Sequence, residues 1–428
     1  MKIGIIGGSG LEKSDILQEI EEIEVETPYG KPSSNVKKCL LDKTEVYILS
    51  RHGPNHEITP TNVNNRANIF ALAKLGCKHI LATTAVGSLK ENIQPGDFMI
   101  ANQFIDFTKH RHVTFFDDFK QGVKHISLAD PFSSELRDYI IDACEELNLP
   151  HHKIGTILTI EGPRFSTRAE SFMFKKSAHV VNMSTAPEAI LAREANVEYA
   201  VIAMTTDYDC WKKTEQPVTW EQIETIMKQN TENVKKVLIR TIEKFAKKDS
   251  SKKHLEYIKK SIRTIPHFPK QGVMYRDITT LLKDPEAMKK VMDIFTKKYK
   301  DKGIDIVTGI ESRGFIFGSL LAEKINASFV PVRKKGKLPA EKETQEYELE
   351  YGTDTLEIHK DAIKPGQKVL VVDDLIATGG TAAATAQLVE KLGGKLEELA
   401  FVIELPDLKG REKLKKHNVY SIVSFEGE

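Results

Sequence analysis

Cysteine is scarce in this chain, and its four cysteines, Cys39, Cys77, Cys144 and Cys210, are widely spaced with no C-x-x-C pair. Such isolated cysteines fit neither a disulfide framework nor a zinc site, and they indicate a reducing compartment. Apolar runs of transmembrane length are also missing. The short apolar start of the chain breaks into glycines and then charge, which is typical of a first strand and not of a signal peptide. We therefore expect a cytoplasmic protein.

An excess of one charge sign is missing as well, because 62 basic side chains balance 61 acidic ones to a net charge of +1. This balance gives no electrostatic reason to expect a nucleic acid or a membrane as partner. Any anionic ligand must therefore be bound by a local site. The length of 428 residues exceeds one ordinary core and indicates at least two domains.

Short β-branched segments alternate with amphipathic segments along the chain, as in α/β domains with largely buried sheets. In the first part the pattern predicts strands at 2–7, 45–50, 79–85, 97–101, 155–160 and 199–206, and helices at 61–75, 133–148, 187–195 and 219–245. In the second part it predicts strands at 305–310, 328–332, 368–374 and 398–405, and helices near 284–300, 314–325 and 380–393.

Between these parts, residues 246–254 are polar and lysine-rich without an apolar period, and we interpret them as a solvated linker. The two parts share a structural class but no repeat period, which indicates a fusion and not a duplication. We expect an α/β protein with two domains, at residues 1–246 and 255–428.

The most informative motif is VLVVDDLIATGGT at 369–381, which reads as a strand ending in two carboxylates, a loop, and a helix starting near Gly380. Backbone N–H groups and hydroxyls at a helix N-terminus can surround a phosphate. The residues that would do so are Ala377, Thr378, Gly379, Gly380 and Thr381. Asp373 and Asp374 can bind a ribose diol or reach Mg²⁺, directly or through water. An ordinary β–α turn with an acidic cap is the alternative, and the absence of a lysine before Thr381 excludes a Walker A loop.

This run resembles the phosphoribosyl-diphosphate (PRPP) motif of the type I phosphoribosyltransferases, and residues 258–428 are similar throughout to the adenine-specific branch of that family. The other matching segments are FPKQGVMYRDIT, ESRGFIFG, VRKKGKLP, YELEYGTDTLEI and LKGREKL. The resemblance implies a parallel-sheet domain that joins adenine to the ribosyl phosphate of PRPP, giving AMP and pyrophosphate. It also implies Mg²⁺ bound through PRPP, with assistance from Asp373 and Asp374.

On the adenine side, the resemblance implies that the backbone of Met274 and the ring of Tyr275 hold the base, with Arg276 at the edge of the pocket. Glu350 would take the N9 proton of adenine, and Tyr351 would help to close the site. The residues alone place Glu350 in a β-hairpin turn that could form a mobile lid, with an exposed strand glutamate as the alternative.

On the diphosphate side, the resemblance implies that Arg313, Arg333, Lys334 and Lys337 face the pyrophosphate. Positive charge there stabilises the leaving group as it departs. The same fold family also contains purine-sensing regulators that bind nucleic acid. The balanced charge and the retention of Glu350, Lys337 and the two aspartates argue against that alternative.

In the first part, GGSG at 7–10 follows the first predicted strand, but Lys13 stands where a dinucleotide fingerprint needs its third glycine. Five further motifs accompany this turn: SRHGPNH, TTAVGSL, TIEGPRFSTRAE, VVNMSTAPE and TTDYDCW. Together they resemble the trimeric purine nucleoside phosphorylases over residues 1–245, and within that family the members that act on methylthioadenosine. The resemblance implies release of adenine and methylthioribose 1-phosphate without an organic cofactor.

The residues that would bind the attacking phosphate are Ser9, Arg51, His52, Thr84 and Ala85. Arg51 would supply a permanent charge, while the hydroxyls and the Ala85 N–H would orient the anion. Met183 and Ser184 would lie beneath the ribose. Taken alone, Arg51 and His52 would read as the surface end of a strand.

Asp207 and Asp209 stand two residues apart beyond a predicted strand and can point to the same side. Adenine leaves more readily when its N7 is protonated, and a buried aspartate with a raised pKa can supply that proton, a role we assign to Asp207. Asp209 can accept a hydrogen bond from the exocyclic amine, which a 6-oxopurine lacks, and so would select aminopurines. A solvated acidic turn is the alternative.

Two positions bear on the 5′ group of the nucleoside. Trp220 stands where the family has a smaller aliphatic residue in the 5′-alkylthio pocket, and His125 matches a residue that borders this pocket across the trimer interface. Adenosine or another 5′-modified aminopurine nucleoside is therefore an alternative first substrate. The resemblances imply a homo-oligomer, a trimer through the first domain with further dimerisation through the second.

Overall fold

A computed structural model describes residues 1–7, 18–120, 122–214, 220–348 and 352–427, without the side chains of 220–225, 227–229 and 348. The chain divides into two compact units, Met1–Asp249 and Ser250–Glu428. Within the described residues, no helix combines the length and the apolar character needed to cross a membrane. All four cysteines carry free thiols.

The first unit is built on a mixed sheet whose strands run, among the described residues, in the order β2-β3-β4-β1-β5-β10-β9-β7, with β11, β6 and β8 joined beside β5. The strand bounds are β1 Lys2–Gly7, β2 Gln18–Ile23, β3 Val36–Leu41, β4 Thr44–Ser50, β5 His79–Ser88, β6 Phe98–Ile100, β7 Gln103–Phe107, β8 His151–His152, β9 Thr156–Ile160, β10 Val180–Asn182 and β11 Glu198–Asp207. The central strands β1, β5 and β11 are parallel and almost entirely buried, which explains their continuous apolar sequences.

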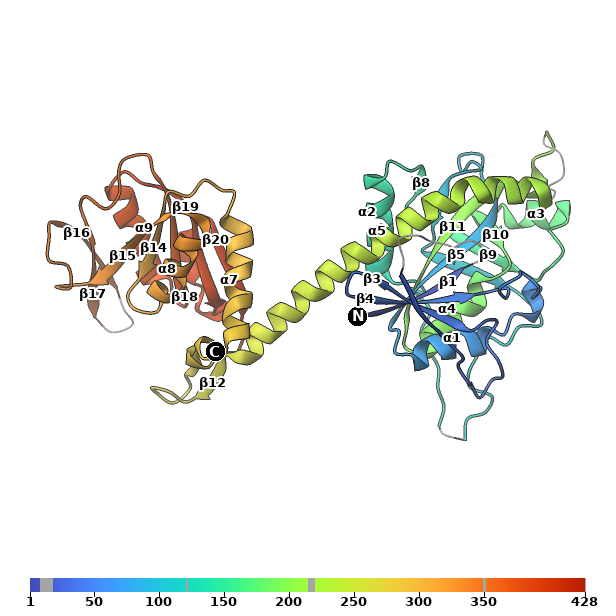
Figure 1. Cartoon of the computed structure of the whole chain (residues 1–428), viewed down its shortest axis with the longest axis horizontal. Coiled ribbons are helices and arrows are strands. Elements are labelled where there is room, and N and C mark those ends of the chain that lie inside the picture. The colour runs from blue at the N-terminus through green and yellow to red at the C-terminus, as the bar shows by residue number, and fades with distance from the viewer. Residues whose placement is uncertain (8–17, 121, 215–219, 349–351, 428) are drawn as a thin grey trace. The chain divides into compact units, whose positions relative to one another are not determined.

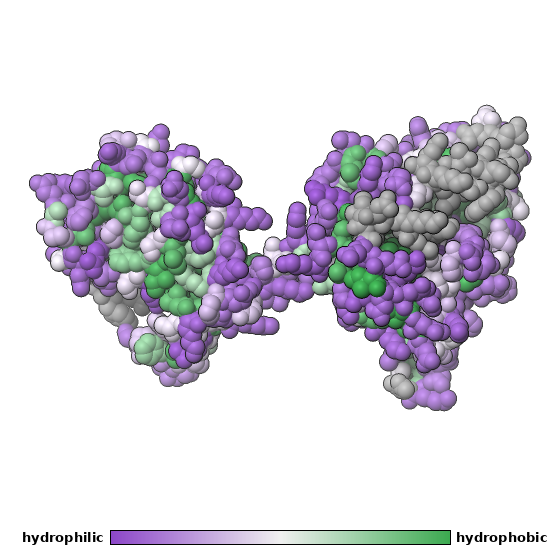
Figure 2. Space-filling model, in the orientation of Figure 1, coloured by the Kyte–Doolittle hydropathy of each residue, from purple (hydrophilic) through white to green (hydrophobic). Residues whose placement is uncertain are grey.

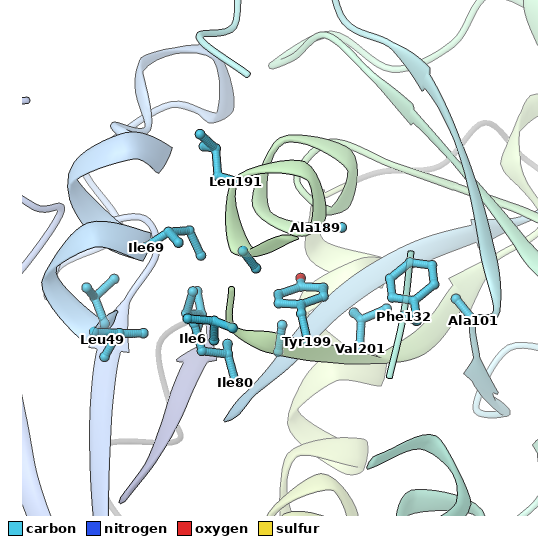
Figure 3. Close-up of a cluster of buried hydrophobic side chains, with 14 of the residues drawn as sticks. Ile6, Leu49, Ile69, Ile80, Ala101, Phe132, Ala189, Leu191, Tyr199 and Val201 are labelled. Carbon is cyan, nitrogen blue, oxygen red and sulfur yellow. The ribbon is translucent and has the colours of Figure 1, made fainter. Parts of the chain in front are cut away.

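Helices cover both faces of this sheet: α1 (Asn65–Lys74) and α4 (Thr185–Glu194) on one face, α2 (Ser134–Glu146) and the first part of α5 (Trp220–Ser261) on the other (Figure 1). On the α1 and α4 face, Ile69 and Leu191 pack with Tyr199 of β11 in one cluster (Figure 3). The short helix α3 (Arg168–Phe174) begins with a capping box between Thr167 and Glu170. These elements hold the ends of β4, β5, β10 and β11 together, where the candidate site lies.

Helix α5 differs from the sequence prediction, which ended the helix at 245 and placed a linker at 246–254. The helix runs for 42 residues without interruption through this stretch. No glycine or proline interrupts it, and its lysines and glutamates are good helix formers. The missing apolar period correctly predicted exposure, since residues 250–253 are exposed and the surface there is hydrophilic (Figure 2). The interpretation of this polar stretch as the end of the helix was wrong, because a polar segment can stay helical without packing against other elements.

The second unit contains a sheet whose described strands run in the order β16-β17-β15-β14-β18-β19-β20. The bounds are β14 Ile306–Ile310, β15 Ser328–Lys334, β16 Lys342–Glu348, β17 Thr353–His359, β18 Lys368–Ile376, β19 Lys395–Glu404 and β20 Val419–Ser424. From β15 to β20 all neighbours are parallel, which confirms the predicted parallel sheet, while β16 and β17 form an antiparallel hairpin. The helices are α6 Thr279–Leu282, α7 Pro285–Tyr299, α8 Gly314–Ile325 and α9 Gly380–Lys391, and a separate hairpin joins β12 (Arg263–Pro266) to β13 (Met274–Asp277).

Candidate active sites

A cavity of about 190 Å³ in the first unit lies at the carboxyl ends of β4, β5, β9, β10 and β11. The structure brings the predicted phosphate ligands Arg51, His52, Thr84 and Ala85 together on its walls. Met183, Ser184, Asp207 and Asp209 line the same cavity. Ser9 lies outside the described residues, and so does the side chain of Trp220. His125 is exposed beside Phe119 and does not line the cavity that the described residues form.

Arg51 is buried, with 3% of its surface exposed, and its guanidinium is largely occupied by protein groups. Nε and Nη2 donate to the two carboxylate oxygens of Glu188 at 2.5 and 3.1 Å, and Nη1 donates to the carbonyl of Thr83 at 2.8 Å. Glu188 also accepts from the hydroxyl of Tyr199 at 2.7 Å. Burial alone would lower the pKa of Arg51, but the Glu188 carboxylate raises it. Glu188 therefore holds the Arg51 guanidinium in place at the cavity wall. This residue was not among those predicted from the sequence.

The hydroxyl groups of this cavity are organised by Asn182 at the end of β10. Its amide Nδ2 donates to the hydroxyl of Thr185 at 2.6 Å and lies 3.2 Å from that of Thr84. The Thr84 and Ser184 hydroxyls are themselves 3.1 Å apart. A bound anion would meet hydroxyls whose orientation is already set.

His52 is neutral at physiological pH. Burial is the main cause that lowers its pKa, to about 4, and the adjacent Arg51 charge adds to this. Its Nδ1 lies 2.8 Å from the carbonyl of Ile58, so in the neutral ring this nitrogen carries the proton and donates. Nε2 is then an acceptor, suited to a P–OH group of the phosphate.

This neutral histidine gives a prediction on pH and stability. Between pH 6.5 and about 4, unfolded His52 binds a proton that the folded chain does not, so the free energy of unfolding falls as the pH drops through this window, by up to about 1.4 kcal/mol per pH unit. We expect His52→Gln to flatten this part of the pH profile of Tm. The exposed His112→Gln serves as the control, and equal slopes in wild type and His52→Gln would contradict the prediction.

The two aspartates beyond β11 differ in their surroundings. Asp207 accepts from the Thr206 hydroxyl and from the backbone N–H of Asp209, each at 2.7 Å. Asp209 takes a left-handed backbone conformation (φ +48°), and its buried Oδ2 has no partner with hydrogen-bond geometry within the described part of the chain. Burial raises the pKa of Asp209. Nearby hydrogen-bond donors oppose this rise, but burial outweighs them. The raised pKa assigned to Asp207 stays a prediction.

The sequence analysis quoted TIEGPRFSTRAE as a motif but assigned no residue within it. Phe165 and Ser166 of this segment line the cavity, and Phe165 presents an aromatic face with 49% of its surface exposed. An aromatic side chain within a motif that already carries the family resemblance is the signal that could have identified it.

The second unit holds a larger cavity, of about 790 Å³, at the carboxyl ends of β14, β15 and β18. The predicted cradle from Ala377 to Thr381 lines it together with Asp373 and Asp374. Gly379 adopts φ +76° as the N-cap of α9, so the loop turns directly into the helix N-terminus. The loop thus stands directly before a helix N-terminus, where backbone N–H groups without a partner in the helix can bind an anion.

Asp373 and Asp374 lie in β18, which continues to Ile376, and not at the end of the strand as predicted. The pKa values of both are raised, Asp373 by burial and by the adjacent Asp374, and Asp374 by burial against the opposing effect of Arg313. Arg313 Nε is 2.9 Å from Asp374 Oδ2 in an ion pair that lacks hydrogen-bond geometry, and Arg313 Nη1 donates to the Tyr275 hydroxyl at 3.0 Å.

These carboxylates fit the Mg²⁺ ion that the resemblance implies. Mg²⁺ prefers oxygen ligands and keeps several waters when substrate phosphates supply the rest. Two adjacent buried carboxylates, one of whose oxygens lacks a hydrogen bond, favour a nearby cation. Among the described residues no group of three His, Cys, Asp or Glu side chains could hold a metal by itself. The donor set therefore suits an ion bound mainly through a diphosphate.

The basic residues predicted to face pyrophosphate are only partly gathered here. Arg313 and Lys334 line the cavity, whereas Arg333 and Lys337 are not among its described lining residues. Arg333 is tied to Glu311, with Nε 3.2 Å from Oε2, and its Nη1 donates to the carbonyl of Lys337. Glu311, which also lines the cavity, was missed by the sequence analysis.

On the predicted adenine side, Tyr275 lines the cavity and packs edge-to-face on Phe268 with ring centroids 5.2 Å apart. Met274 is half-buried in β13. The guanidinium of Arg276 lies over the Phe425 ring at 4.5 Å and donates to the Thr264 hydroxyl, and its place at the edge of an adenine pocket stays a prediction. Glu350 and Tyr351 lie outside the described residues, between the strands β16 and β17 of the hairpin predicted for them.

Two further residues of the larger cavity, Tyr347 and Asp354, were missed. They come from β16 and β17, and the Tyr347 hydroxyl donates to Asp354 at 3.3 Å. Lys334 Nζ lies 3.7 Å from the same carboxylate. The YELEYGTD motif contains both residues, but only the pairing of the two strands shows that they meet.

Comparison with known proteins agrees with this division. Residues 2–243 match the phosphorylase superfamily, and residues 277–427 match the phosphoribosyl transferase domain. The chain is 50% identical over 243 residues to the S-methyl-5′-thioadenosine phosphorylase of Pyrococcus furiosus, covering 57% of this chain and 92% of the relative. It is 48% identical over 253 residues to that of Danio rerio, covering 58% and 90%.

A solved structure of a mutant of adenosine/methylthioadenosine phosphorylase from Schistosoma mansoni, in complex with adenine, is 39% identical. It aligns with a TM-score of 0.55 over 57% of this chain and 92% of its own. Through residues 2–243 the chain belongs to the phosphorylase superfamily, and it carries a phosphoribosyl transferase domain over residues 277–427.

Proposed function

We propose that the chain is a bifunctional purine salvage enzyme. Its first unit converts methylthioadenosine and phosphate to adenine and methylthioribose 1-phosphate, and its second unit converts adenine and PRPP to AMP and pyrophosphate. The observation that carries the proposal is the pair of cavities. The first places Arg51 in the same cavity as Asp207 and Asp209. The second places the N-terminus of α9 beside Asp373 and Asp374. The names of the relatives support methylthioadenosine as the first substrate.

In the first step, Arg51 and the hydroxyls of Thr84 and Ser184 hold phosphate for attack on C1′ of the nucleoside. Because Glu188 already fixes Arg51, the cation needs no reorganisation when the anion binds. Asp207 faces N7 of the leaving adenine, and Asp209 accepts from its exocyclic amine. Both lie over Gly87, where a Cβ would come within 3.1 Å of Asp207 Oδ2, so glycine there leaves room for the carboxylates.

In the second step, the loop 377–381 binds the 5′-phosphate of PRPP and the two carboxylates bind its ribose diol. Arg313 and Lys334 stabilise the charge that develops on pyrophosphate. Glu350 removes the N9 proton of adenine. Asp373 and Asp374 would help to hold Mg²⁺ bound through the diphosphate, and the ion would supply positive charge beside the leaving pyrophosphate.

Adenosine is the second candidate for the first step. The Schistosoma mansoni protein is an adenosine/methylthioadenosine phosphorylase. The resemblance of the sequence also implies that Trp220 replaces a smaller residue of the 5′ pocket. The family resemblance of the motifs in the first unit supports a homotrimer, in which His125 of a neighbouring copy borders this pocket. The scattered free cysteines support a location in the cytoplasm.

The test is to incubate the full chain with methylthioadenosine or adenosine and phosphate, with and without PRPP and Mg²⁺, and to identify the products chromatographically. Phosphorolysis is close to balanced, so removal of adenine pulls it forward by about 1.4 kcal/mol for each tenfold drop in free adenine. We expect PRPP to increase nucleoside consumption, with AMP accumulating in place of adenine. Consumption that is independent of PRPP would contradict the coupled function.

A further inference from the structure

One motif of the second unit, LKGREKL at 408–414, has no role in the steps above. Its segment leaves β19 at Glu404 and passes through two short 3-10 helices, η3 (Pro406–Leu408) and η4 (Gly410–Leu414). Within the described residues, no member of this segment lines the larger cavity. The segment lies instead against the back of the phosphate loop.

The contact between loop and segment is made by backbone on both sides. A Cβ added to Gly379 would overlap the carbonyl oxygen of Gly410, and a Cβ added to Gly410 would overlap the carbonyl oxygen of Ala377. No side-chain rotation can relieve such overlaps, because the colliding atoms belong to the main chain. The position of Gly410 therefore limits where the loop 377–379 can lie.

Gly410 is in turn held by its neighbour Arg411. The guanidinium binds both carboxylate oxygens of Glu404, with Nε–Oε1 at 2.6 Å and Nη2–Oε2 at 2.7 Å. Nη1 donates to the carbonyl of Val419 at 2.8 Å, and Ser421 donates to Glu404 at 2.5 Å. Leu414, 1% exposed, anchors the far end of the segment in the core. This planar, bidentate geometry specifies position in a way that a lysine could not.

We propose that Arg411 is a positioning residue for PRPP, which acts through Gly410 to fix the backbone of the phosphate loop. The inference rests on the proposed phosphoribosyltransferase function of the second unit. A loop whose N–H groups are displaced by even about 1 Å loses much of its anion affinity, although adenine, bound elsewhere, is held as before.

The experiment compares full-length wild type, Arg411→Ala, Arg411→Lys and the control Lys413→Ala, an exposed residue of the same short helix. We expect Arg411→Ala to raise the KM for PRPP about tenfold and to leave the KM for adenine nearly unchanged. Arg411→Lys should recover part of the wild-type affinity for PRPP, because lysine keeps the positive charge but cannot form both hydrogen bonds to the Glu404 carboxylate. Gly410→Ala should likewise raise the KM for PRPP and leave the KM for adenine unchanged. Lys413→Ala should have the KM values of wild type.

Equal increases in both KM values, or a KM for PRPP within about twofold of wild type in folded Arg411→Ala, would overturn the inference. The far-ultraviolet circular dichroism spectrum and the Tm of the second unit report whether each variant is folded. A wild-type chain that makes no AMP would overturn the proposed function instead. In that case the dissociation constant of ribose 5-phosphate, whose phosphate the loop would hold, decides the inference, which requires weaker binding to Arg411→Ala than to wild type.

Discussion

Replacement of both Asp373 and Asp374 by asparagine should lower AMP formation from adenine by at least about 10³-fold and leave phosphorolysis nearly unchanged. The two carboxylates face the cavity beside the phosphate loop, where we propose that they bind the ribose diol of PRPP and assist Mg²⁺. Asparagine keeps the shape but loses the charge and half of the acceptor capacity. Separate initial rates of AMP formation and of phosphorolysis measure the effect.

The double variant should remain folded, because it removes the mutual repulsion that raises the pKa of Asp373. We expect its Tm to equal or exceed that of wild type. The matched control is Asp293→Asn combined with Asp361→Asn, which removes two exposed carboxylates from the same unit. Loss of both activities in a folded double variant would contradict the independence of the two sites.

Asp207→Asn should lower phosphorolysis of methylthioadenosine by about 10²–10⁴-fold, because the amide cannot pass a proton to N7 as the bond to adenine breaks. The AMP-forming activity measures integrity of the second unit in the same sample. Asp106→Asn is a close control, since Asp106 is an exposed aspartate whose carboxylate also accepts a backbone N–H two residues further along.

Asp209→Asn should have a different effect, a smaller loss of rate with weaker discrimination against 6-oxopurines, because an amide can donate where the carboxylate only accepts. The ratio of turnover of methylthioadenosine to that of methylthioinosine measures it. If Asp209→Asn abolished phosphorolysis while Asp207→Asn remained active, the proton donor would be Asp209, the carboxyl whose pKa burial raises.

The sequence by itself determined the central strands of both sheets and the position of the glycine-rich loop at 377–381, but it left out strands such as β2, β3 and β20. β1, β11 and α8 fall within one residue of their predicted bounds, since buried parallel strands and amphipathic helices have distinct apolar periods. The loop 377–381 was predicted as a phosphate-binding loop because glycines and hydroxyl side chains at the start of a helix are typical of anion sites. Such local features depend on the order of residues alone.

Tertiary structure decided which side chains meet. Glu188 is 137 residues from Arg51, yet it fixes the cation of the phosphate site, and no local pattern relates them. Likewise, Arg276 lies against the ring of Phe425, and burial raises the pKa of Asp209. Pairing, burial and desolvation arise only when distant segments exclude water from one another. For that reason the positions of the sites follow from the sequence, whereas the charge and the orientation of their groups follow from the packed structure.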